Sequence, residues 1–353
     1  MTHKNTYKAQ SKAQSKVAVI LLNWNGKEDT LECLASVKQL DYSNYEIVLV
    51  DNGSVDGSVD AFTKYYPDVT LLQTGENLGY AGGNNVGISY ALDNKAEYVL
   101  LLNNDTVIDV QLINAFIEAS KAIGIPAILG GKIYYYAQPD TLWYAGARWI
   151  PSELDFEHIG LGQKDAPIYD LISKTDYVTG CLLFVPTEIF HQVGLLDEDF
   201  FLIYEETDWC YRARKYGYDC YYIPTAKIWH KISVSFGGSQ SPIFEYFMAR
   251  NRLLWASKHL GFLSRVKVYG QYLNRIWTRI FPNFILADAS IPIVKRYVWS
   301  IVSWLKTVKF YFLLSSNRAL IIGVVDYFFR RLGNCPESIR KLSRSKLSNQ
   351  LLT

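Results

Sequence analysis

The chain has 353 residues, of which 49% are apolar and 20% charged, so it is a globular protein and not a disordered one. This length exceeds one ordinary core and suffices for two or three domains. The five cysteines are scattered without a CxxC pair, which argues against a disulfide framework or a zinc site and for a reducing compartment. Aromatic residues make up 15%, a richness typical of sugar sites and of membrane interfaces.

The net charge of +2 hides an asymmetry along the chain. Residues 262–353 carry 15 Lys and Arg against three acidic residues, which leaves 21 basic and 31 acidic residues in 1–261. A basic tail on an acidic body indicates an anionic partner, either phospholipid or nucleic acid. Aliphatic and aromatic residues interleave with the basic ones, so we expect lipid and no nucleic acid. Residues 1–16 are polar and basic without an apolar core, which predicts a flexible tail in a cytosolic protein and not a signal peptide.

Buried strands alternate with helices in the first part of the chain. Apolar runs predict strands at 17–22, 46–50, 69–72 and 98–102, and helical spacing predicts helices at about 28–40 and 58–66. Such alternation is typical of a doubly wound α/β sheet. Each strand is followed by polar residues on what should be one edge of the sheet: Asn23, Asp51, Asn77 and Asp105. Because open α/β sheets bind ligands beyond the carboxyl ends of their strands, this edge is expected to form one wall of a site.

The middle of the chain is less regular. We expect helices at about 110–123, up to Lys215 and at 241–259, strands at 126–136 and 176–185, and a loop-rich segment at 137–175. Gly217 follows the second of these helices in the usual place for a helix end.

The composition changes after Gly261. In 266–280 apolar residues recur at helical spacing while a basic stripe follows on another face (Lys267, Gln271, Arg275 and Arg279), which predicts an amphipathic helix. From 280 to 330 the chain is apolar and aromatic, but charges interrupt it and disfavour a spanning helix. We expect 262–353 to lie on an anionic membrane surface; a soluble helical subdomain is the alternative.

A nucleotide is the ligand best suited to the first strand ends. Asp51 could accept hydrogen bonds from a base or a ribose. A purely turn-forming role before Gly53 would explain this residue equally well. No GxGxxG follows the first strand and GxxxxGK[ST] is absent, which leaves a Rossmann dinucleotide site and P-loop chemistry without support.

The segment 77–85 combines three glycines with amide side chains. Glycines allow close approach of the backbone, and N–H groups at the start of a following helix can hold phosphate. A flexible loop is the alternative for this segment.

Two acidic stretches are candidates for chemistry. In Asn103-Asn104-Asp105, a cation at Asp105 could bridge the phosphates of a nucleoside diphosphate, whereas the same residues also fit an Asx turn. In Glu205-Glu206-Thr207-Asp208, like charges raise one another's pKa, which suits a general base; a solvated helix start is the alternative. His230 could be a second metal ligand or a phosphate contact, although a lone histidine is more often structural.

In this order, these residues resemble family 2 glycosyltransferases, and specifically the rhamnosyltransferase-like branch of bacterial polysaccharide assembly. The matching elements are Val19–Gly26, Val50–Ser54 with Asp56–Ser58, Asn77–Gly87, Leu101–Asp105, Thr179–Cys181, Gly194–Asp197 with Phe200-Phe201, Tyr204–Arg212 and His230. The resemblance covers about residues 17–260.

The resemblance implies a GT-A fold, with a mostly parallel sheet and flanking helices, and inverting transfer from a nucleoside-diphosphate sugar, dTDP- or UDP-linked. A rhamnose-like sugar is favoured. It implies that Asp105 binds Mg²⁺ or Mn²⁺ with His230 as second ligand, although Asn103 stands where many relatives have Asp. It also implies that Glu206 is the base, supported by Glu205 and Asp208. The expected donor-binding residues are Asn23, Asn25, Asp51, Asn77, Gly79, Gly83, Asn84 and Asn104.

We therefore expect a flexible tail at 1–16, a catalytic domain at 17–260, and a helical, membrane-associating region at 261–353. The resemblance implies a glycan or lipid-diphosphate-linked acceptor and a peripheral location on the inner face of the cytoplasmic membrane. Two alternatives stay open: a non-catalytic nucleotide-sugar-binding scaffold, and a sugar nucleotidyltransferase. The latter would need a basic glycine-rich loop after the first strand, where 23–26 has no Lys or Arg.

Overall fold

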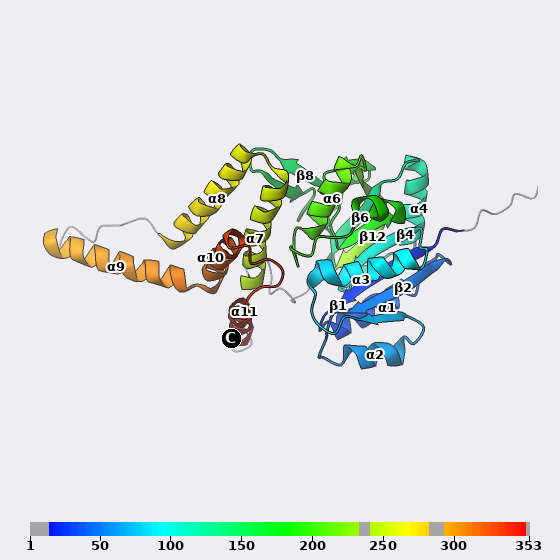
Figure 1. The fold of residues 1–353 in the computed structure, drawn as a ribbon, viewed down its shortest axis with the longest axis horizontal. Helices are drawn as coiled ribbons and strands as arrows, with labels where there is room; N and C mark the ends of the chain where they lie inside the picture. Colours follow the sequence, from blue (N-terminus) through cyan, green and yellow to red (C-terminus); the bar gives the residue numbers. More distant parts are fainter. Residues whose placement is uncertain (1–13, 233–240, 282–292, 351–353) are drawn as a thin grey trace, which may run out of the picture.

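The computed structural model describes residues 14–232, 241–281 and 293–350 (Figure 1). Residues 1–13 of the predicted tail lie outside this range, as do 282–292 of the apolar stretch. At the beginning of the described part, the Tyr42 hydroxyl donates to the Ser15 carbonyl at 2.6 Å, and Lys16 Nζ lies 3.0 Å from Glu46 Oε2. Residues 15 and 16 are therefore attached to the body of the protein.

One large sheet forms the core of the first part of the chain. Along its main path the strands follow the order β10-β12-β6-β11-β4-β1-β2-β3, with β5 paired to β12 and β7 to β6. Their bounds are β1 Val17–Asn23, β2 Tyr45–Asp51, β3 Thr70–Gln73, β4 Tyr98–Asn103, β5 Thr106–Ile108, β6 Ile128–Tyr135, β7 Gln138–Tyr144, β10 Ser173–Thr175, β11 Leu182–Pro186 and β12 Cys220–His230. A separate hairpin joins β8 Ala147–Ile150 and β9 Asp155–His158.

Helices flank this sheet and continue beyond it. The helices of the first part are α1 Lys27–Val37, α2 Ser58–Tyr65, α3 Gly79–Asp93, α4 Leu112–Ile123, α5 Thr187–Val193 and α6 Glu205–Lys215, with a 3₁₀ turn η1 at Pro167–Tyr169. The C-terminal helices are α7 Pro242–His259, α8 Phe262–Ile280, α9 Ile293–Leu313, α10 Ser315–Phe328 and α11 Glu337–Gln350.

The predicted α/β architecture with a mostly parallel sheet is confirmed. Strands β3, β2, β1 and β4 run parallel, and their apolar side chains form the main core. The register places Asn23 beside Asp51, so the polar ends of β1 and β2 meet at one edge as predicted. Strand β11 is antiparallel between β4 and β6, and β12 runs parallel to β6.

Three segments differ from the sequence-based expectations. The glycine-rich segment forms the first half of α3 and is not a loop. Its glycines let this helix lie close to the sheet, since a Cβ on Gly87 would be only 2.6 Å from Ile20 Cγ2. The region 137–175 contains four short strands, whose pairing depends on distant partners. Strand β11 begins only at Leu182, six residues later than predicted for it.

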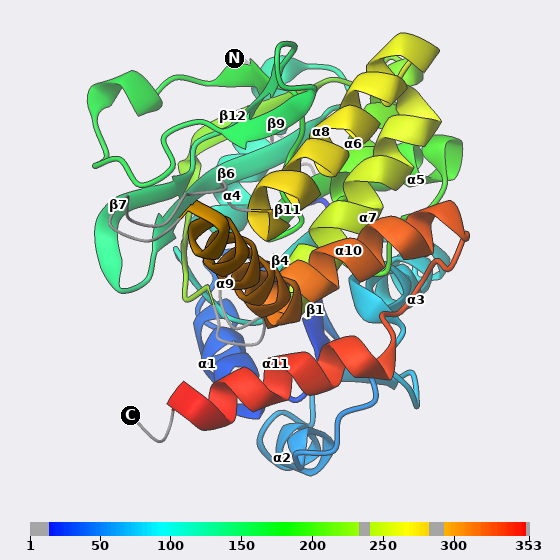
Figure 2. The same cartoon turned by 90° about the vertical axis from the view of Figure 1, so that its left-hand side faces the viewer.

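The C-terminal helices pack against the segment that leads into α6, except for α9, which projects from it (Figure 1). Side chains of α7, α8 and α10 share a core with Phe200 and Tyr204. Figures 1 and 2 show α9 extending away from this core. Among the described helices, none alone has the length and hydropathy of a membrane span, but α9 and α10, which meet at a 69° bend, reach both as a pair.

The basic stripe predicted for α8 is mostly engaged in contacts within the protein. Arg275 and Arg279 each form an ion pair of 2.9 Å with Glu245 of α7, and Lys267 Nζ donates to the Ser152 carbonyl at 3.0 Å. Much of the solvent-exposed surface of α8 is apolar, since Phe262, Leu263, Leu273 and Trp277 are more than half exposed.

Candidate functional site

The amide of Asn23 connects the ends of β1 and β2. Its Nδ2 donates to Asp51 Oδ1 at 2.9 Å and to Ser54 Oγ at 3.0 Å, while its Oδ1 accepts from Thr30 Oγ1 at 2.9 Å. The Ser54 N–H donates to Asp51 Oδ2 at 3.0 Å. Asn23 and Asp51 are both buried, so these hydrogen bonds set the orientation of the Asp51 carboxylate.

Asn25 and Asn104 extend this network along the same edge. Asn104 Nδ2 donates to Thr30 Oγ1 at 2.7 Å, and Asn25 Oδ1 accepts from the Val55 N–H at 2.8 Å. Asn25 has a φ of 52°, which asparagine tolerates better than most residues. The structure thus brings these two amides to the edge that Asn23 and Asp51 occupy.

The start of α3 is covered by the carbonyl of Phe201. The N–H groups of Tyr80 and Ala81 donate to this carbonyl at 2.6 and 3.3 Å, and a Cβ on Gly79 would lie 2.4 Å from its oxygen. Phosphate binding at a helix start needs free N–H groups. The predicted phosphate contact of Gly79 is therefore replaced in the structure by close packing.

The other members of the glycine-rich segment also have internal partners. A Cβ on Gly83 would lie 2.4 Å from Leu22 Cδ1. Asn77 Oδ1 accepts the first N–H of α3 at 2.8 Å, and Asn84 Nδ2 donates to the Tyr80 carbonyl at 2.9 Å. These contacts shape the helix start, and donor binding by Asn77, Gly83 and Asn84 stays a prediction.

Asp105 and His230 meet where β5 and β12 pair. His230 lies opposite Thr106 in this antiparallel pair, and its Nε2 is 3.1 Å from Asp105 Oδ1. Both side chains are buried, and His230 Nδ1 is buried without a hydrogen-bond partner among the described residues. Burial lowers the pKa of His230, but Cys181 and Asp105 raise it more strongly, to about 10.

Glu205 and Glu206 begin α6. Glu205 is buried and Glu206 half-buried, and Oε2 of each is buried without a hydrogen-bond partner among the described residues. Burial, and then the charge of Glu206, raises the pKa of Glu205 well above its usual range. Burial also raises the pKa of Glu206, but backbone N–H groups at Glu206, Gly180 and Thr207 oppose this rise. These backbone N–H groups therefore favour the ionised form of Glu206.

Cys181 lies near both acidic parts of the site, Asp105 with His230 on one side and Glu206 on the other. Burial and the charges of Asp105 and Glu206 raise the pKa of its thiol, whereas His230 lowers it. All three side chains are therefore within electrostatic reach of Cys181. The sequence showed Cys181 only as part of the family resemblance.

Tyr80 is a further site residue for which the sequence indicated no role. Its hydroxyl donates to the Gly180 carbonyl at 2.6 Å, and burial followed by the charges of Glu205 and Glu206 raises its pKa. This tyrosine therefore joins α3 to the segment that faces the glutamates. Its position within a glycine-rich stretch offered no signal for this contact.

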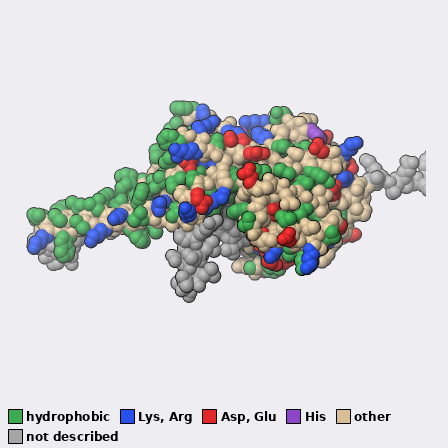
Figure 3. Space-filling view, turned by 60° about the horizontal axis from the view of Figure 1, so that its bottom comes forward, with side chains coloured by type: hydrophobic (Ala, Val, Ile, Leu, Met, Phe, Trp, Pro, Cys, Tyr) green, Lys and Arg blue, Asp and Glu red, His purple; other side chains and the backbone are tan. Residues whose placement is uncertain are grey.

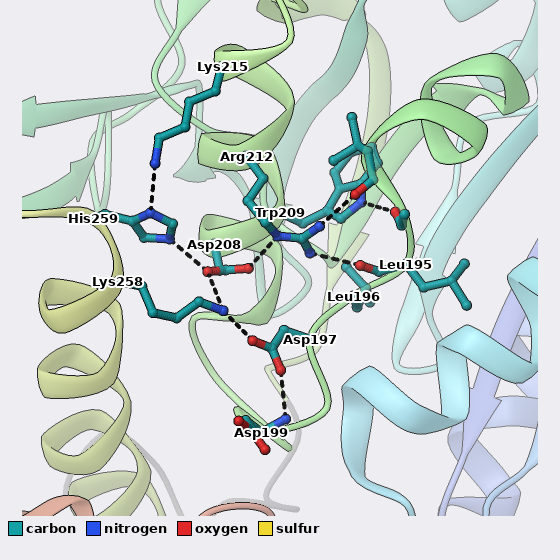
Figure 4. Close-up of polar contacts among 12 residues, drawn as sticks. Leu195, Leu196, Asp197, Asp199, Asp208, Trp209, Arg212, Lys215, Lys258 and His259 are labelled. Atoms are coloured by element: carbon teal, nitrogen blue, oxygen red, sulfur yellow. Dashed lines mark hydrogen bonds and ion pairs between the residues drawn. The ribbon is translucent and has the colours of Figure 1, made fainter.

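Asp208, predicted to support the glutamates, points toward α7 instead (Figure 4). Its carboxylate lies 2.8 Å from Arg212 Nε, 3.2 Å from Lys258 Nζ and 2.7 Å from His259 Nε2. Burial raises its pKa, but His259 and Arg212 lower it more strongly, to about 2. A carboxylate that stays ionised is a weak proton acceptor, so the structure gives Asp208 a structural role and corrects our prediction.

The same cluster anchors the segment before the turn that leads into α6. Arg212 donates to the carbonyls of Val193 at 2.9 Å and Leu195 at 2.7 Å, and Lys258 forms an ion pair with Asp197 (Figure 4). Helices α6 and α7 are thereby joined to residues 193–197.

Comparisons with known proteins indicate the family. Residues 18–184 match the family model described as glycosyl transferase family 2. The chain is 27% identical over 280 residues to a low-salt glycan biosynthesis hexosyltransferase of Haloferax volcanii, covering 77% of this chain and 82% of the relative. It is also 27% identical over 266 residues to a dTDP-rhamnosyl transferase of Shigella flexneri, covering 72% and 84%. An N-acetylglucosaminyl-diphospho-decaprenol L-rhamnosyltransferase of Mycobacterium tuberculosis is 27% identical over 248 residues, covering 65% and 80%.

Two solved structures share the fold. A mannosyltransferase from Pyrobaculum calidifontis, in complex with GDP-Man and Mn²⁺, superposes with a TM-score of 0.53 at 15% identity, covering 90% of this chain and 88% of that one. A GalNAc-T7 structure with UDP, GalNAc and Mn²⁺ gives 0.52 at 15% identity, covering 74% and 54%. These likenesses confirm the expected GT-A-like α/β fold.

The ion pairs of Asp208 predict a pH-dependent contribution to stability. Asp208→Asn is expected to lower the free energy of unfolding by about 2.5 kcal/mol at pH 7, the value for a carboxyl whose pKa falls from about 3.9 to about 2 on folding. Because the pKa is lower in the folded state, this contribution is complete above about pH 4 and is lost as the pH falls toward 2. Thermal midpoints of wild type and variant should therefore converge as buffers are made more acidic. A difference that stays constant down to pH 3 would contradict this role.

Proposed function

This chain is a member of glycosyl transferase family 2 through its residues 18–184, and we propose that it is an inverting hexosyltransferase. Its donor would be a nucleoside-diphosphate sugar and its acceptor a glycan or lipid-linked glycan of cell-surface polysaccharide assembly. The observation that carries the proposal is the pair of unpartnered Oε2 atoms on Glu205 and Glu206. Buried carboxylate oxygens without a partner are rare in folded proteins, and an acceptor hydroxyl is the donor that this pair lacks.

Glu206 is the base in this proposal. It accepts the proton of the acceptor hydroxyl, whose oxygen forms a bond to the anomeric carbon as the bond from that carbon to the diphosphate breaks. Attack from the side opposite the diphosphate inverts the anomeric centre. Glu205 would carry the proton that keeps the pair at a single negative charge, because burial and the charge of Glu206 both disfavour its ionisation.

The edge formed by β1 and β2 would bind the nucleoside. The Asp51 carboxylate is preset by Asn23 and can accept from a ribose hydroxyl or a base N–H. Two relatives, a dTDP-rhamnosyl transferase and an L-rhamnosyltransferase, support a dTDP-linked donor with a rhamnose-like sugar, and a UDP-linked donor is the alternative.

Asp105 and His230 would hold a divalent cation, Mg²⁺ or Mn²⁺. The fit rests on Asp105 Oδ1 and His230 Nε2, which lie 3.1 Å apart just before β5 and at the end of β12. Because this contact favours the protonated form of His230, a cation would bind by displacing that proton. No group of three or more His, Cys, Asp or Glu side chains suited to a metal occurs in the described part of the chain, so diphosphate and water would complete the coordination. Such a cation neutralises charge on a departing diphosphate.

Helices α8 and α9 would attach the enzyme to the inner face of the cytoplasmic membrane. Apolar side chains cover the projecting arm, with basic residues among them (Figure 3). Trp277, Tyr297 and Trp299 are about half to two-thirds exposed, and Lys306 and Lys309 are exposed near the end of α9. Aromatic and basic side chains together suit the interface of an anionic bilayer.

Exchange of the proposed base is the central test. Glu206→Gln is expected to lower kcat by about 10²- to 10⁴-fold, because transfer then proceeds without a general base. The assay measures release of nucleoside diphosphate from a panel of dTDP-, UDP- and GDP-sugars with an acceptor and Mn²⁺. In wild type, kcat should fall as the pH drops through an apparent pKa above the ordinary glutamate value of 4.5, since burial raises the pKa of Glu206.

Glu205→Gln is the matched control for this test. Glutamine resembles a protonated glutamate, so this variant is expected to keep most of its activity. If Glu206→Gln binds donor and transfers at the wild-type rate, the base assignment is wrong. If wild type binds a donor but transfers with none, the scaffold alternative is favoured.

The metal assignment is tested by ligand-induced stabilisation. Mn²⁺ is expected to raise the thermal midpoint of wild type with bound dTDP or UDP, because a ligand of the native state stabilises it by mass action. Asp105→Asn should abolish the Mn²⁺-dependent part of the rise in thermal midpoint and keep the rise caused by nucleotide alone. The control is Asp140→Asn, which alters an exposed carboxylate paired with Lys164. An equal response of Asp105→Asn and wild type to Mn²⁺ would exclude Asp105 as a ligand.

Flotation with liposomes tests the membrane surface. The full chain is expected to float with vesicles that contain anionic lipid, less so in high salt. Lys306→Gln with Lys309→Gln should weaken binding by about 30-fold, since each basic residue near such a surface contributes about 1 kcal/mol. Ile168→Gln with Leu171→Gln, two apolar residues at least 70% exposed on the catalytic part, should not change it. Flotation that is independent of anionic lipid and of both lysines would contradict the proposal.

A further inference from the structure

The turn that leads into Glu205 has an unusual backbone. Phe201, Ile203 and Tyr204 have φ angles of 62°, 70° and 80°. Residues with a Cβ rarely adopt this left-handed region, so three within four positions require surroundings that hold them there. Because Tyr204 is the residue directly before α6, the conformation of the Phe200–Tyr204 turn decides where the two glutamates point.

Asn251 of α7 binds three carbonyls of this turn. Its Nδ2 lies 2.8 Å from the Phe200 oxygen and 2.7 Å from those of Leu202 and Ile203. Its Oδ1 accepts from Arg250 Nε at 2.8 Å, which orients the amide. Asn251 is fully buried and lies far from the turn in sequence.

Arg250 also directs its N–H groups at main-chain carbonyls. Nη2 donates to Phe200 at 2.8 Å and to Asp199 at 3.2 Å, while Nη1 donates to Gly333. The Gly333 N–H in turn donates to the Asp199 carbonyl at 3.0 Å. Burying a guanidinium completely is unfavourable unless its hydrogen bonds are satisfied, and here they are satisfied by the segment that leads into the glutamates.

The same turn contacts the nucleotide side of the site. The Phe201 carbonyl accepts from the first turn of α3, and Tyr80 of that turn reaches the Gly180 carbonyl. The turn is therefore held between α3 and α7, and the segment at Gly333 binds both Asp199, just before the turn, and Arg250.

We propose that Arg250 and Asn251 are positioning residues for sugar transfer: they hold the Phe200–Tyr204 turn and thereby direct Glu205 and Glu206 at the acceptor, without touching donor or acceptor. The inference rests on the proposed function, because it assigns the residues that orient the proposed base. A purely structural role would lower stability alone, whereas a positioning role lowers the rate of transfer in protein that is still folded and still binds donor.

Two variants of the full chain test the inference, Arg250→Lys and Asn251→Ala. Each is expected to lower kcat by about 10- to 100-fold, since displacing a catalytic group by about 1 Å has an effect of this size. The thermal-shift response to dTDP or UDP should stay near that of wild type. Hydrogen exchange followed by mass spectrometry should show faster exchange in residues 199–206 and unchanged protection of β1 and β4.

Glu245→Gln is the matched control within the same helix. Glu245 is buried in α7, but it pairs with Arg275 and Arg279 of α8 and not with the turn. This variant should lower the thermal midpoint and leave kcat and the exchange of 199–206 unchanged. A kcat loss no larger than that of Glu245→Gln at a similar midpoint would overturn the inference.

The outcomes separate this inference from the proposed function. If wild type transfers no sugar from the donor panel, the proposed function fails, and the exchange measurement still tests the turn. If Asn251→Ala and Arg250→Lys leave exchange in 199–206 unchanged, the positioning inference fails even when wild type is an active transferase.

Discussion

The conformation of the Phe200–Tyr204 turn is the constraint on which the site depends. Its left-handed residues each cost about 1 to 3 kcal/mol, so the turn persists only because hydrogen bonds from both sides hold it. Helix α3, which packs on the parallel sheet, donates backbone N–H groups to the Phe201 carbonyl. Helix α7, which packs among the C-terminal helices, donates from Arg250 and Asn251 to the Phe200 carbonyl. The direction of Glu205 and Glu206 is therefore a property of the assembled fold and not of their own helix.

The start of α6 places carboxylates in two opposite environments. Glu205 is buried and Glu206 half-buried, neither forms an ion pair among the described residues, and the pKa values of both rise, which suits proton transfer. Asp208 meets Arg212, Lys258 and His259, and its pKa falls to about 2. Three acidic residues that look equivalent in sequence therefore divide into a pair with raised pKa values and an ion-paired anchor.

The C-terminal helices have two distinct relations to the rest of the protein. Helix α7 belongs to the structure around Glu205 and Glu206, because its polar side chains bind the Phe200–Tyr204 turn and Asp208. Helices α8 and α9 turn apolar side chains outward, whereas Arg275 and Arg279 of α8 are used in pairs with Glu245. A membrane surface, as proposed, would thus be met mainly by apolar side chains and by the lysines of α9.

The sequence by itself determined the parallel half of the sheet, the helices beside it, the edge where Asn23, Asp51 and Asp105 lie, and the family. These features are readable because a buried strand with a polar end is a local pattern, and because the ordered set of motifs is specific. Only the tertiary structure decided that the glycine-rich segment is a closely packed helix, that Asp208 is an anchor, and that Arg250 and Asn251 hold the catalytic turn. Each of these depends on which distant residues meet: Asn251 and Ile203 are 48 positions apart, and no local pattern records that contact.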